Sequence, residues 1–299
     1  MENHPDVAAF LSYLKFEKRY SVHTLEAYRR DLEQFCGFME EQYPGTSLLS
    51  ATSLEIRTWM VQLMEDQITA RSIGRKVSAL RAFYRYHSKQ AHLSVNPMEA
   101  IVAPKIAKRL PQFVEAADMD RLFRDELFED TFEGHRDRLI MELFYVTGMR
   151  LSELVGLRKC DVNLYDCQLK VLGKRNKERI IPFSPRVKGL IENYLNEFEE
   201  KYPSVSEKSF IFVAPNGNKI YAKAVYRIVR KYLDMVTTID KRSPHVLRHT
   251  FATQMLNNGA DINAIKEILG HSSLAATQVY THNSIEKLKN IYNQAHPRA

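Results

Sequence analysis

Apolar residues recur at intervals of three and four along the first part of the chain. Val7, Phe10, Leu11 and Leu14 form one apolar face, which predicts an amphipathic helix. Similar spacing continues to about His87 without an alternating strand pattern, so a compact domain of four helices is expected. The expected helices are Val7–Leu14, Leu25–Met39 after the capping residue Ser21, a third carrying Trp59, Leu63 and Met64, and Thr69–His87, in which Ile73, Val77, Leu80 and Tyr84 face inward.

The second part of the chain combines helical periodicity with one strand pattern. Gln168–Leu172 alternates polar and apolar residues, Glu178–Pro182 follows, and the basic segment Gly173–Lys177 lies between them. This is typical of a β-hairpin with a basic turn. The expected fold class is therefore mostly α with a small β-sheet or hairpin in the C-terminal part. Helices are expected at about Met119–Leu127, Arg136–Tyr145, Val187–Tyr202, Ala222–Val236, Val246–Asn257, Ile262–Leu269 and Ser284–Gln294.

A short basic segment bounded by prolines separates the two parts. Asn96-Pro97 and Pro104-Lys105 end the first helical pattern, and Lys105–Pro111 is rich in cations. This composition is typical of an inter-domain linker that lies on a polyanion. We therefore expect an N-terminal helical domain over residues 1–104, a linker over 105–112 and a larger C-terminal domain over 113–299.

Composition narrows the class of protein. The chain has 299 residues and a formal net charge of +7, which favours a polyanionic partner such as nucleic acid. No apolar run approaches the roughly 20 residues that cross a bilayer, and Met1–Asp6 begins no secretory signal. The three cysteines form no CxxC pair, which excludes a disulfide framework and a cysteine-based zinc site. A cytoplasmic protein without a membrane partner is expected.

The cations of the fourth expected helix gather opposite its apolar face. No acidic residue occurs between Asp66 and Glu99, whereas basic residues recur one helical turn apart. Exposed helix faces usually mix both charges, so contact with the DNA backbone is the favoured interpretation and a solvated surface is the alternative. The expected DNA contacts are Arg71, Arg75, Lys76, Arg81, Arg85 and Lys89, joined by Lys105, Lys108 and Arg109 of the linker.

The second part also carries an ordered set of residues that suit chemistry on a phosphate. Arg150 follows a glycine turn, Lys174 lies in the hairpin turn, and Tyr280 comes nine residues after His271. Between them lies an HxxR motif formed by His245 and Arg248. The order Arg, Lys, HxxR, GHxS and Tyr resembles that of the tyrosine site-specific recombinases of the phage integrase family. Within that family the chain is most similar to the Xer type, which resolves chromosome dimers, and the resemblance includes the opening segments Ser21–Thr24 and Tyr28–Leu32.

The resemblance implies both a fold and a set of site residues. The implied fold is a two-domain, C-shaped DNA clamp with an N-terminal DNA-binding domain and a C-terminal catalytic domain. Glu153, one helical turn from Arg150, could orient that arginine or the histidines. Lys177 shares the hairpin turn with Lys174 and is the alternative catalytic lysine. The implied catalytic residues are Arg150, Lys174, His245, Arg248, His271 and the nucleophile Tyr280.

The chemistry of phosphoryl transfer explains why these residue types are needed. Negative charge develops on the equatorial phosphate oxygens, and two guanidiniums, those of Arg150 and Arg248, can meet it. Tyr280 would attack, His245 could accept its proton, and Lys174 would protonate the leaving 5′-oxygen. The resulting 3′-phosphotyrosyl link is itself a phosphodiester bond, so a 5′-hydroxyl can rejoin the strand without ATP. We therefore expect neither a cofactor nor a metal ion.

The resemblance also implies partners. The expected substrate is a double-stranded DNA recombination site, with a tetramer assembled on two such sites and a DNA translocase as a further possible partner. The terminal helix around Ile285–Tyr292 would dock on a neighbouring protomer, whereas packing within its own chain is the alternative. Two other functions stay open, namely an integrase or invertase of a mobile or invertible element, and a non-catalytic DNA-binding protein.

Overall fold

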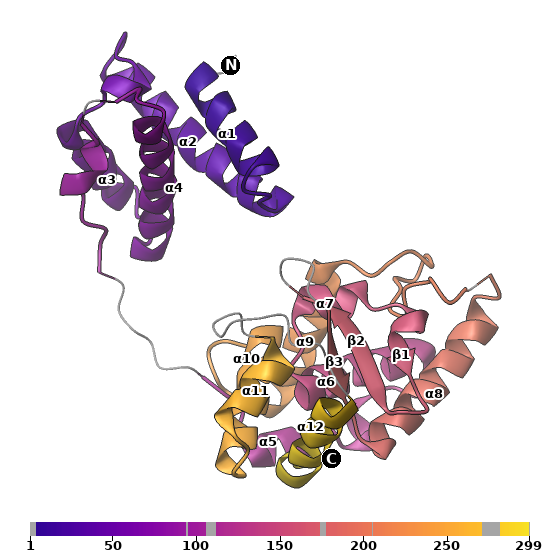
Figure 1. The fold of residues 1–299 in the computed structure, drawn as a ribbon. Coiled ribbons are helices and arrows are strands. Elements are labelled where there is room, and N and C mark those ends of the chain that lie inside the picture. The colour runs from indigo at the N-terminus through magenta and orange to yellow at the C-terminus, as the bar shows by residue number, and fades with distance from the viewer. Residues whose placement is uncertain are drawn as a thin grey trace. The chain divides into compact units, whose positions relative to one another are not determined.

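The chain folds into two compact units, Met1–Arg109 and Leu110–Ala299 (Figure 1). The computed structural model describes residues 4–93, 95–105, 112–173, 178–204, 206–270 and 282–298, with side chains from 288 onward in the last stretch. Among the described residues, no helix is long and apolar enough to cross a membrane.

The N-terminal unit is built from four α-helices, as the periodicity predicted. Side-chain caps begin two of them, because the Ser21 hydroxyl accepts from the Thr24 backbone N–H and Thr69 caps the fourth helix in the same way. Each helix buries one face in a common core, and the inward residues expected on the fourth helix are all buried. The helices are α1 (Pro5–Phe16), α2 (Val22–Gln42), α3 (Ser53–Glu65) and α4 (Ala70–Lys89), with 3-10 turns at Leu48–Ser50 and Pro97–Ala100.

The C-terminal unit surrounds a small sheet with helices, which confirms the mostly helical fold class. The sheet has the order β1-β2-β3 and is antiparallel throughout. The helices are α5 (Ala116–Leu122), α6 (Phe132–Thr147), α7 (Leu151–Gly156), α8 (Pro185–Lys201), α9 (Ala222–Val236), α10 (Pro244–Asn257), α11 (Ile262–Leu269) and α12 (His282–Ala295). The strands are β1 (Val162–Asn163), β2 (Gln168–Leu172) and β3 (Glu178–Pro182).

The predicted hairpin is confirmed with its boundaries. Strand β2 pairs with β3 so that Gln168 lies opposite Pro182 and Leu172 opposite Glu178. Strand β1 was not predicted, because two residues are too short to show an alternating pattern.

One expected helix is divided in the structure. The prediction of a continuous helix over Met119–Leu127 is wrong, since α5 ends at Leu122 and a separate 3-10 turn follows at Asp125–Leu127. Asp125 of this turn lies 2.6 Å from Arg138 of α6, but its side chain is 86% exposed, so this ion pair contributes little stability. Local periodicity does not show the break.

Helix α12 packs on its own unit. It contacts α10, α11 and β3, and its residues Leu288 and Tyr292 are buried. Beyond the helix, the Arg298 guanidinium pairs with the fully buried carboxylate of Glu142 at 2.7 Å. The C-terminal end of the chain is therefore anchored in the core of the C-terminal unit.

Candidate active site

The glycine turn before Arg150 is required by both backbone conformation and space. Gly148 ends α6 in the left-handed region, with φ at +57°. A Cβ atom at this position would lie 2.6 Å from Phe251 and 2.7 Å from Leu269. Only glycine fits, and the turn brings Arg150 to the N-cap of α7.

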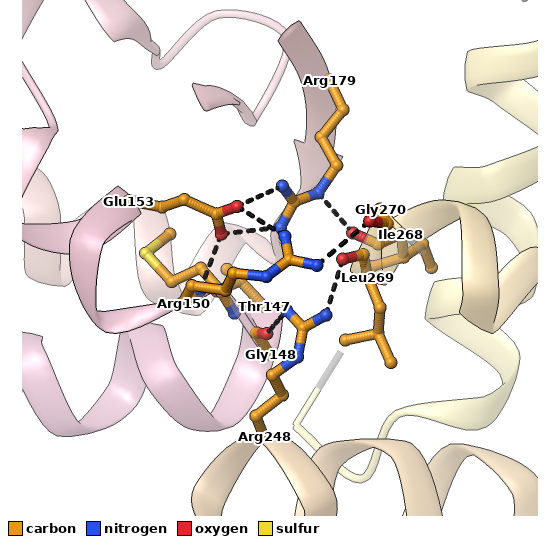
Figure 2. Close-up of polar contacts among 10 residues, drawn as sticks. Thr147, Gly148, Arg150, Glu153, Arg179, Arg248, Ile268, Leu269 and Gly270 are labelled. Carbon is orange, nitrogen blue, oxygen red and sulfur yellow. Dashed lines mark hydrogen bonds and ion pairs between the residues drawn. The ribbon is translucent and has the colours of Figure 1, made fainter. Parts of the chain in front are cut away.

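The carboxylate of Glu153 joins two arginines (Figure 2). It accepts from the Arg150 backbone N–H at 2.7 Å and from the Arg150 Nη1 at 2.8 Å. On its other side, Arg179 Nη1 and Nη2 donate to it at 2.7 and 2.9 Å. Burial alone would raise the pKa of Glu153, but the contacts with Arg179 and Arg150 outweigh it and lower that pKa to about 2. Glu153 is thus a buried anchor that is ionised at neutral pH.

Three arginines donate to three consecutive carbonyl oxygens at the carboxyl end of α11. Ile268 O accepts from Arg179 Nε at 2.7 Å, Leu269 O from Arg248 Nη2 at 2.6 Å and Gly270 O from Arg150 Nη2 at 3.0 Å. Carbonyls at a helix end lack intrahelical partners and carry the negative end of the helix dipole. We call Ile268 O, Leu269 O and Gly270 O the carbonyl row. It gathers cations from α7, β3 and α10 in one place.

Arg248 is the most enclosed cation of the predicted set. It is 6% exposed, and its Nη1 donates to Gly148 O at 2.6 Å. Burial lowers the pKa of Arg248 to about 10, and the charges of Arg150 and Arg179 contribute. This pKa lies well above neutrality, so the guanidinium stays protonated.

His245 lies one helical turn before Arg248 on α10. Its ring centroid is 4.8 Å from that of His249. Desolvation lowers the pKa of His245, and the charges of His249, Arg248 and Arg150 lower it further. The imidazole is therefore held neutral near pH 7, which is the form that can accept a proton.

The structure brings together part of the predicted site. Arg150 and Arg248 meet at the carbonyl row, Glu153 holds Arg150, and His245 shares a helix with Arg248. Three predicted catalytic residues lie outside the described residues, namely Lys174, His271 and Tyr280.

The sequence analysis missed Arg179. It lies on β3 opposite Val171, and its side chain is 5% exposed. Its position in the strand could have revealed it. Arg179 lies two residues before the buried Ile181, so both side chains point to the same face of the sheet. A cation on the buried face of a strand indicates a buried anionic partner.

Some cations on the expected basic face of α4 contact polar groups of the protein, and others are exposed. Lys76 is buried, with its Nζ 3.1 Å from the Asp31 carboxylate, so the expectation that it lies on the exposed face is wrong. Arg75 also pairs with Asp31, and Arg81 donates to Ile101 O at 3.0 Å. Exposed cations of the predicted DNA-contact set, for which the described residues provide no polar partner, are Arg71, Arg85 and Lys89 of α4 and Lys105. Lys108 and Arg109 lie outside the described residues.

Within the described ranges, no group of three His, Cys, Asp or Glu side chains could hold a metal ion. The charges that gather at the carbonyl row come from arginine side chains.

Comparison with known proteins decides the family. Residues 112–287 match the model described as "Phage integrase family", and residues 7–91 match "Phage integrase, N-terminal SAM-like domain". The chain belongs to the phage integrase family. The resemblance drawn from the sequence motifs is thereby confirmed.

Relatives within the phage integrase family are tyrosine recombinases. The chain is 39% identical to tyrosine recombinase XerC of Chlorobaculum parvum, over 97% of this chain and 94% of that protein. It is also 39% identical to tyrosine recombinase XerC of Staphylococcus aureus strain MSSA476, over 97% of this chain and 96% of that protein. The chain is accordingly a site-specific tyrosine recombinase of the Xer type, an enzyme that breaks and rejoins DNA.

Solved structures share the fold. XerH recombinase bound to palindromic difH in a post-cleavage complex gives a TM-score of 0.72 at 20% identity, covering 95% of this chain and 83% of that one. A lambda integrase dimer bound to a core site gives 0.68 at 19% identity, covering 94% and 100%. At these identities the likeness concerns the fold.

Proposed function

We propose that Arg150 and Arg248 clamp the scissile phosphate of a DNA recombination site while Tyr280 attacks it. One observation carries this proposal. Two guanidiniums that lie almost one hundred residues apart in the sequence are fixed on neighbouring carbonyl oxygens, Leu269 O and Gly270 O. Both positive charges therefore lie where the segment that leads to Tyr280 begins, and both can act on the same phosphate.

Both arginines keep donors for a phosphate. A guanidinium has five N–H groups. Contacts within the described residues use two nitrogen atoms of Arg150, Nη1 and Nη2, and the same two of Arg248. The remaining N–H groups can meet the equatorial oxygens, where negative charge develops in the transition state. Because the clamp is already fixed, little reorganisation accompanies the reaction.

The remaining roles complete a balanced transesterification. The Tyr280 oxygen bonds to phosphorus and its proton passes to the neutral imidazole of His245, while the bond to the 5′-oxygen breaks. Lys174 supplies the proton that this 5′-oxygen takes up, with Lys177 as the alternative donor. His271 hydrogen-bonds a non-bridging oxygen. The products are a 3′-phosphotyrosyl link and a free 5′-hydroxyl, and a 5′-hydroxyl from a second duplex reverses the step to exchange strands.

The cellular role we propose is resolution of chromosome or plasmid dimers. It is supported by the 39% identity to XerC proteins along nearly the whole chain. We further propose that four protomers assemble on two sites in the cytoplasm, and that α12, which packs on its own unit in this structure, is released on assembly and docks on a neighbouring protomer. A lambda integrase tetramer bound to a Holliday junction has the same fold, with a TM-score of 0.67 at 19% identity, which supports this assembly.

The chemistry is tested with a duplex that is nicked close to the cleavage point, so that the covalent product accumulates. The wild-type enzyme should give a protein–DNA adduct on a denaturing gel, and Tyr280→Phe should give none. Arg150→Ala and Arg248→Ala should each lower adduct formation by at least about 100-fold, while a mobility-shift assay shows site binding close to wild type. Tyr221→Phe, at an exposed tyrosine of the same unit, is the matched control.

Two results would contradict the proposal. An adduct formed by Tyr280→Phe would remove the nucleophile assignment, and near-normal cleavage by Arg248→Ala would remove the clamp. Sequencing DNA that is covalently trapped in cells tests the role, because a single chromosomal site is expected for dimer resolution. Sites that flank a mobile or invertible element would instead support the integrase or invertase function.

A further inference from the structure

The most enclosed ion pair at the site involves a residue to which the reaction as proposed gives no task. Arg179 is 4% exposed and uses all three guanidinium nitrogens in contacts with protein groups. Both Nη atoms donate to Glu153 and Nε donates to Ile268 O (Figure 2). All three contacts go to Glu153 or the carbonyl row, and Arg179 is the least exposed of the three arginines described at the site.

The two partners of Arg179 both lead to the clamp. Glu153 is the carboxylate that holds the Arg150 guanidinium and the Arg150 backbone N–H. Ile268 O is the first oxygen of the carbonyl row. Arg248 and Arg150 donate to the next two oxygens of that row. Arg179 therefore touches neighbours of both clamp arginines without contacting either one through a hydrogen bond in the described structure.

The contact between β3 and the end of α11 is tight. Gly270 has a φ of +64°, and a Cβ atom there would lie 3.1 Å from Arg179 Cδ and 3.2 Å from its Nη1. The Arg179 side chain thus packs directly against the backbone whose carbonyl receives Arg150 Nη2. A shorter or displaced side chain at position 179 would leave this backbone without support.

We propose that Arg179 is a positioning residue for the phosphate clamp. It fixes Glu153, and through Glu153 the Arg150 guanidinium, at a set distance from the carboxyl end of α11. This inference rests on the proposed clamp of Arg150 and Arg248. If Arg179 positions the clamp, its loss should slow cleavage most when the phosphate carries a negative charge. If its role is only structural, its loss should slow cleavage equally on a charged and a neutral phosphate.

A substrate without that charge provides the test. Replacing one non-bridging oxygen of the scissile phosphate by a methyl group gives a neutral methylphosphonate, which needs less cationic stabilisation. On the ordinary phosphodiester, Arg179→Met should lower the single-turnover rate of adduct formation by about 100-fold, the loss typical of a misplaced catalytic group. On the methylphosphonate the same variant should stay within about 10-fold of wild type. Arg150→Ala serves as the benchmark for this pattern.

Two further variants keep the test decisive. Arg179→Lys retains the charge and one donor group, so it should fold even where Arg179→Met does not, and it should show an intermediate loss on the phosphodiester only. Lys170→Met is the matched control, because Lys170 is an exposed cation on the partner strand of the same hairpin. It should leave both rates unchanged. Circular dichroism at the assay temperature checks that each variant is folded.

The possible outcomes are distinct. Equal losses on both substrates would make Arg179 a structural residue, and no loss on the phosphodiester would remove any role. Either result overturns the inference while the wild-type adduct leaves the proposed function intact. If Arg150→Ala also loses nothing on the phosphodiester, the proposed clamp itself fails.

Discussion

Asp31 in the N-terminal unit and Glu153 in the C-terminal unit are both buried carboxylates that receive two cations, yet their surroundings differ. Both cations on Asp31, Arg75 and Lys76, come from neighbouring positions of α4, so their contact joins α2 to α4. The cations on Glu153 come from α7 and β3, and each also donates to the end of α11. The first arrangement joins two helices, whereas the second also ties its guanidiniums to the carbonyl row.

The comparison separates two ways in which a buried carboxylate is used. Burying an ion pair offers little net stability, since the desolvation penalty offsets much of the attraction. Exposure does not separate the two clusters, because Arg75 on Asp31 keeps 48% of its side chain exposed and Arg150 on Glu153 keeps 32%. The second contacts do separate them. Both cations on Glu153 also donate to the carbonyl row, whereas Lys76 is enclosed by Asp31 and Gln34.

The largest effect is expected when the carboxylate at the site is removed. Glu153→Ala leaves Arg179 buried without its anion, which should cost about 3–5 kcal/mol of unfolding free energy. It also frees Arg150, so adduct formation should fall by at least about 100-fold. Thermal unfolding by circular dichroism and single-turnover cleavage measure the two effects. Glu192→Ala removes an exposed i,i+4 partner of Lys188 and should cost less than about 1 kcal/mol.

The acid dependence of stability sharpens the same prediction. The pKa of Glu153 is held at about 2, below its ordinary value of 4.5. A depressed pKa stabilises the folded state fully above about pH 4.5, and this contribution is lost as the pH falls towards 2. Glu153→Gln cannot titrate, so the stability difference between wild type and this variant should shrink over that range. A difference that stays constant from pH 5 to 2.5 would contradict the assignment of the shift to Glu153.

Removing the other carboxylate should affect stability and leave cleavage intact. Asp31→Ala strands the buried Lys76 and should destabilise the N-terminal unit by about 3 kcal/mol. The single tryptophan of the chain, Trp59, is buried in this unit against Phe35, so its fluorescence reports this unfolding. Glu153→Ala should leave the fluorescence transition in place, and that contrast is the observation that separates the two clusters.

The cleavage rate completes this test. Below the unfolding transition and at saturating enzyme, Asp31→Ala should form adduct at the wild-type rate. Glu33→Ala, at an exposed acidic residue of the same helix, is the matched control for stability. If Asp31→Ala lost cleavage as strongly as Glu153→Ala, the distinction between a cluster that joins two helices and one that orients the proposed clamp would be wrong.

The smallest effects are expected from the exposed cations of α4. We predict that Arg71→Ala, Arg85→Ala and Lys89→Ala each remove about one phosphate contact. Each should then reduce the slope of log affinity against log salt concentration by about 0.9, with little change in cleavage at saturation. Titrations at several salt concentrations measure the slope. Lys15→Ala on α1 is the control, and an equal change there would show that the effect is not specific to α4.

Much of the architecture could be predicted from local patterns. The bounds of α9, α11 and the hairpin strands follow from periodicity because those segments have one apolar face and clear ends. The cap Ser21 could be predicted for the same reason, since it depends on a neighbour three residues away. Thr69 was expected as the first residue of its helix, and the structure makes it the N-cap. The break after α5 could not be predicted, because the helical periodicity continues across it from Met119 to Leu127.

The sequence by itself determined which residue types are available to a recombinase of this family and in what order: two arginines, a glutamate one turn from the first, and an HxxR motif on a helix. Only the tertiary structure decided which cations are exposed and which contact carboxylates or carbonyl oxygens inside the protein. Lys76 lies on the charged stretch of α4 yet is buried by Asp31, and Arg179 lies in an ordinary strand yet supports Glu153. The physical reason is that residues distant in the sequence determine whether a charge is buried and which carboxylate or carbonyl it contacts. The local spacing of residues carries no information about these partners.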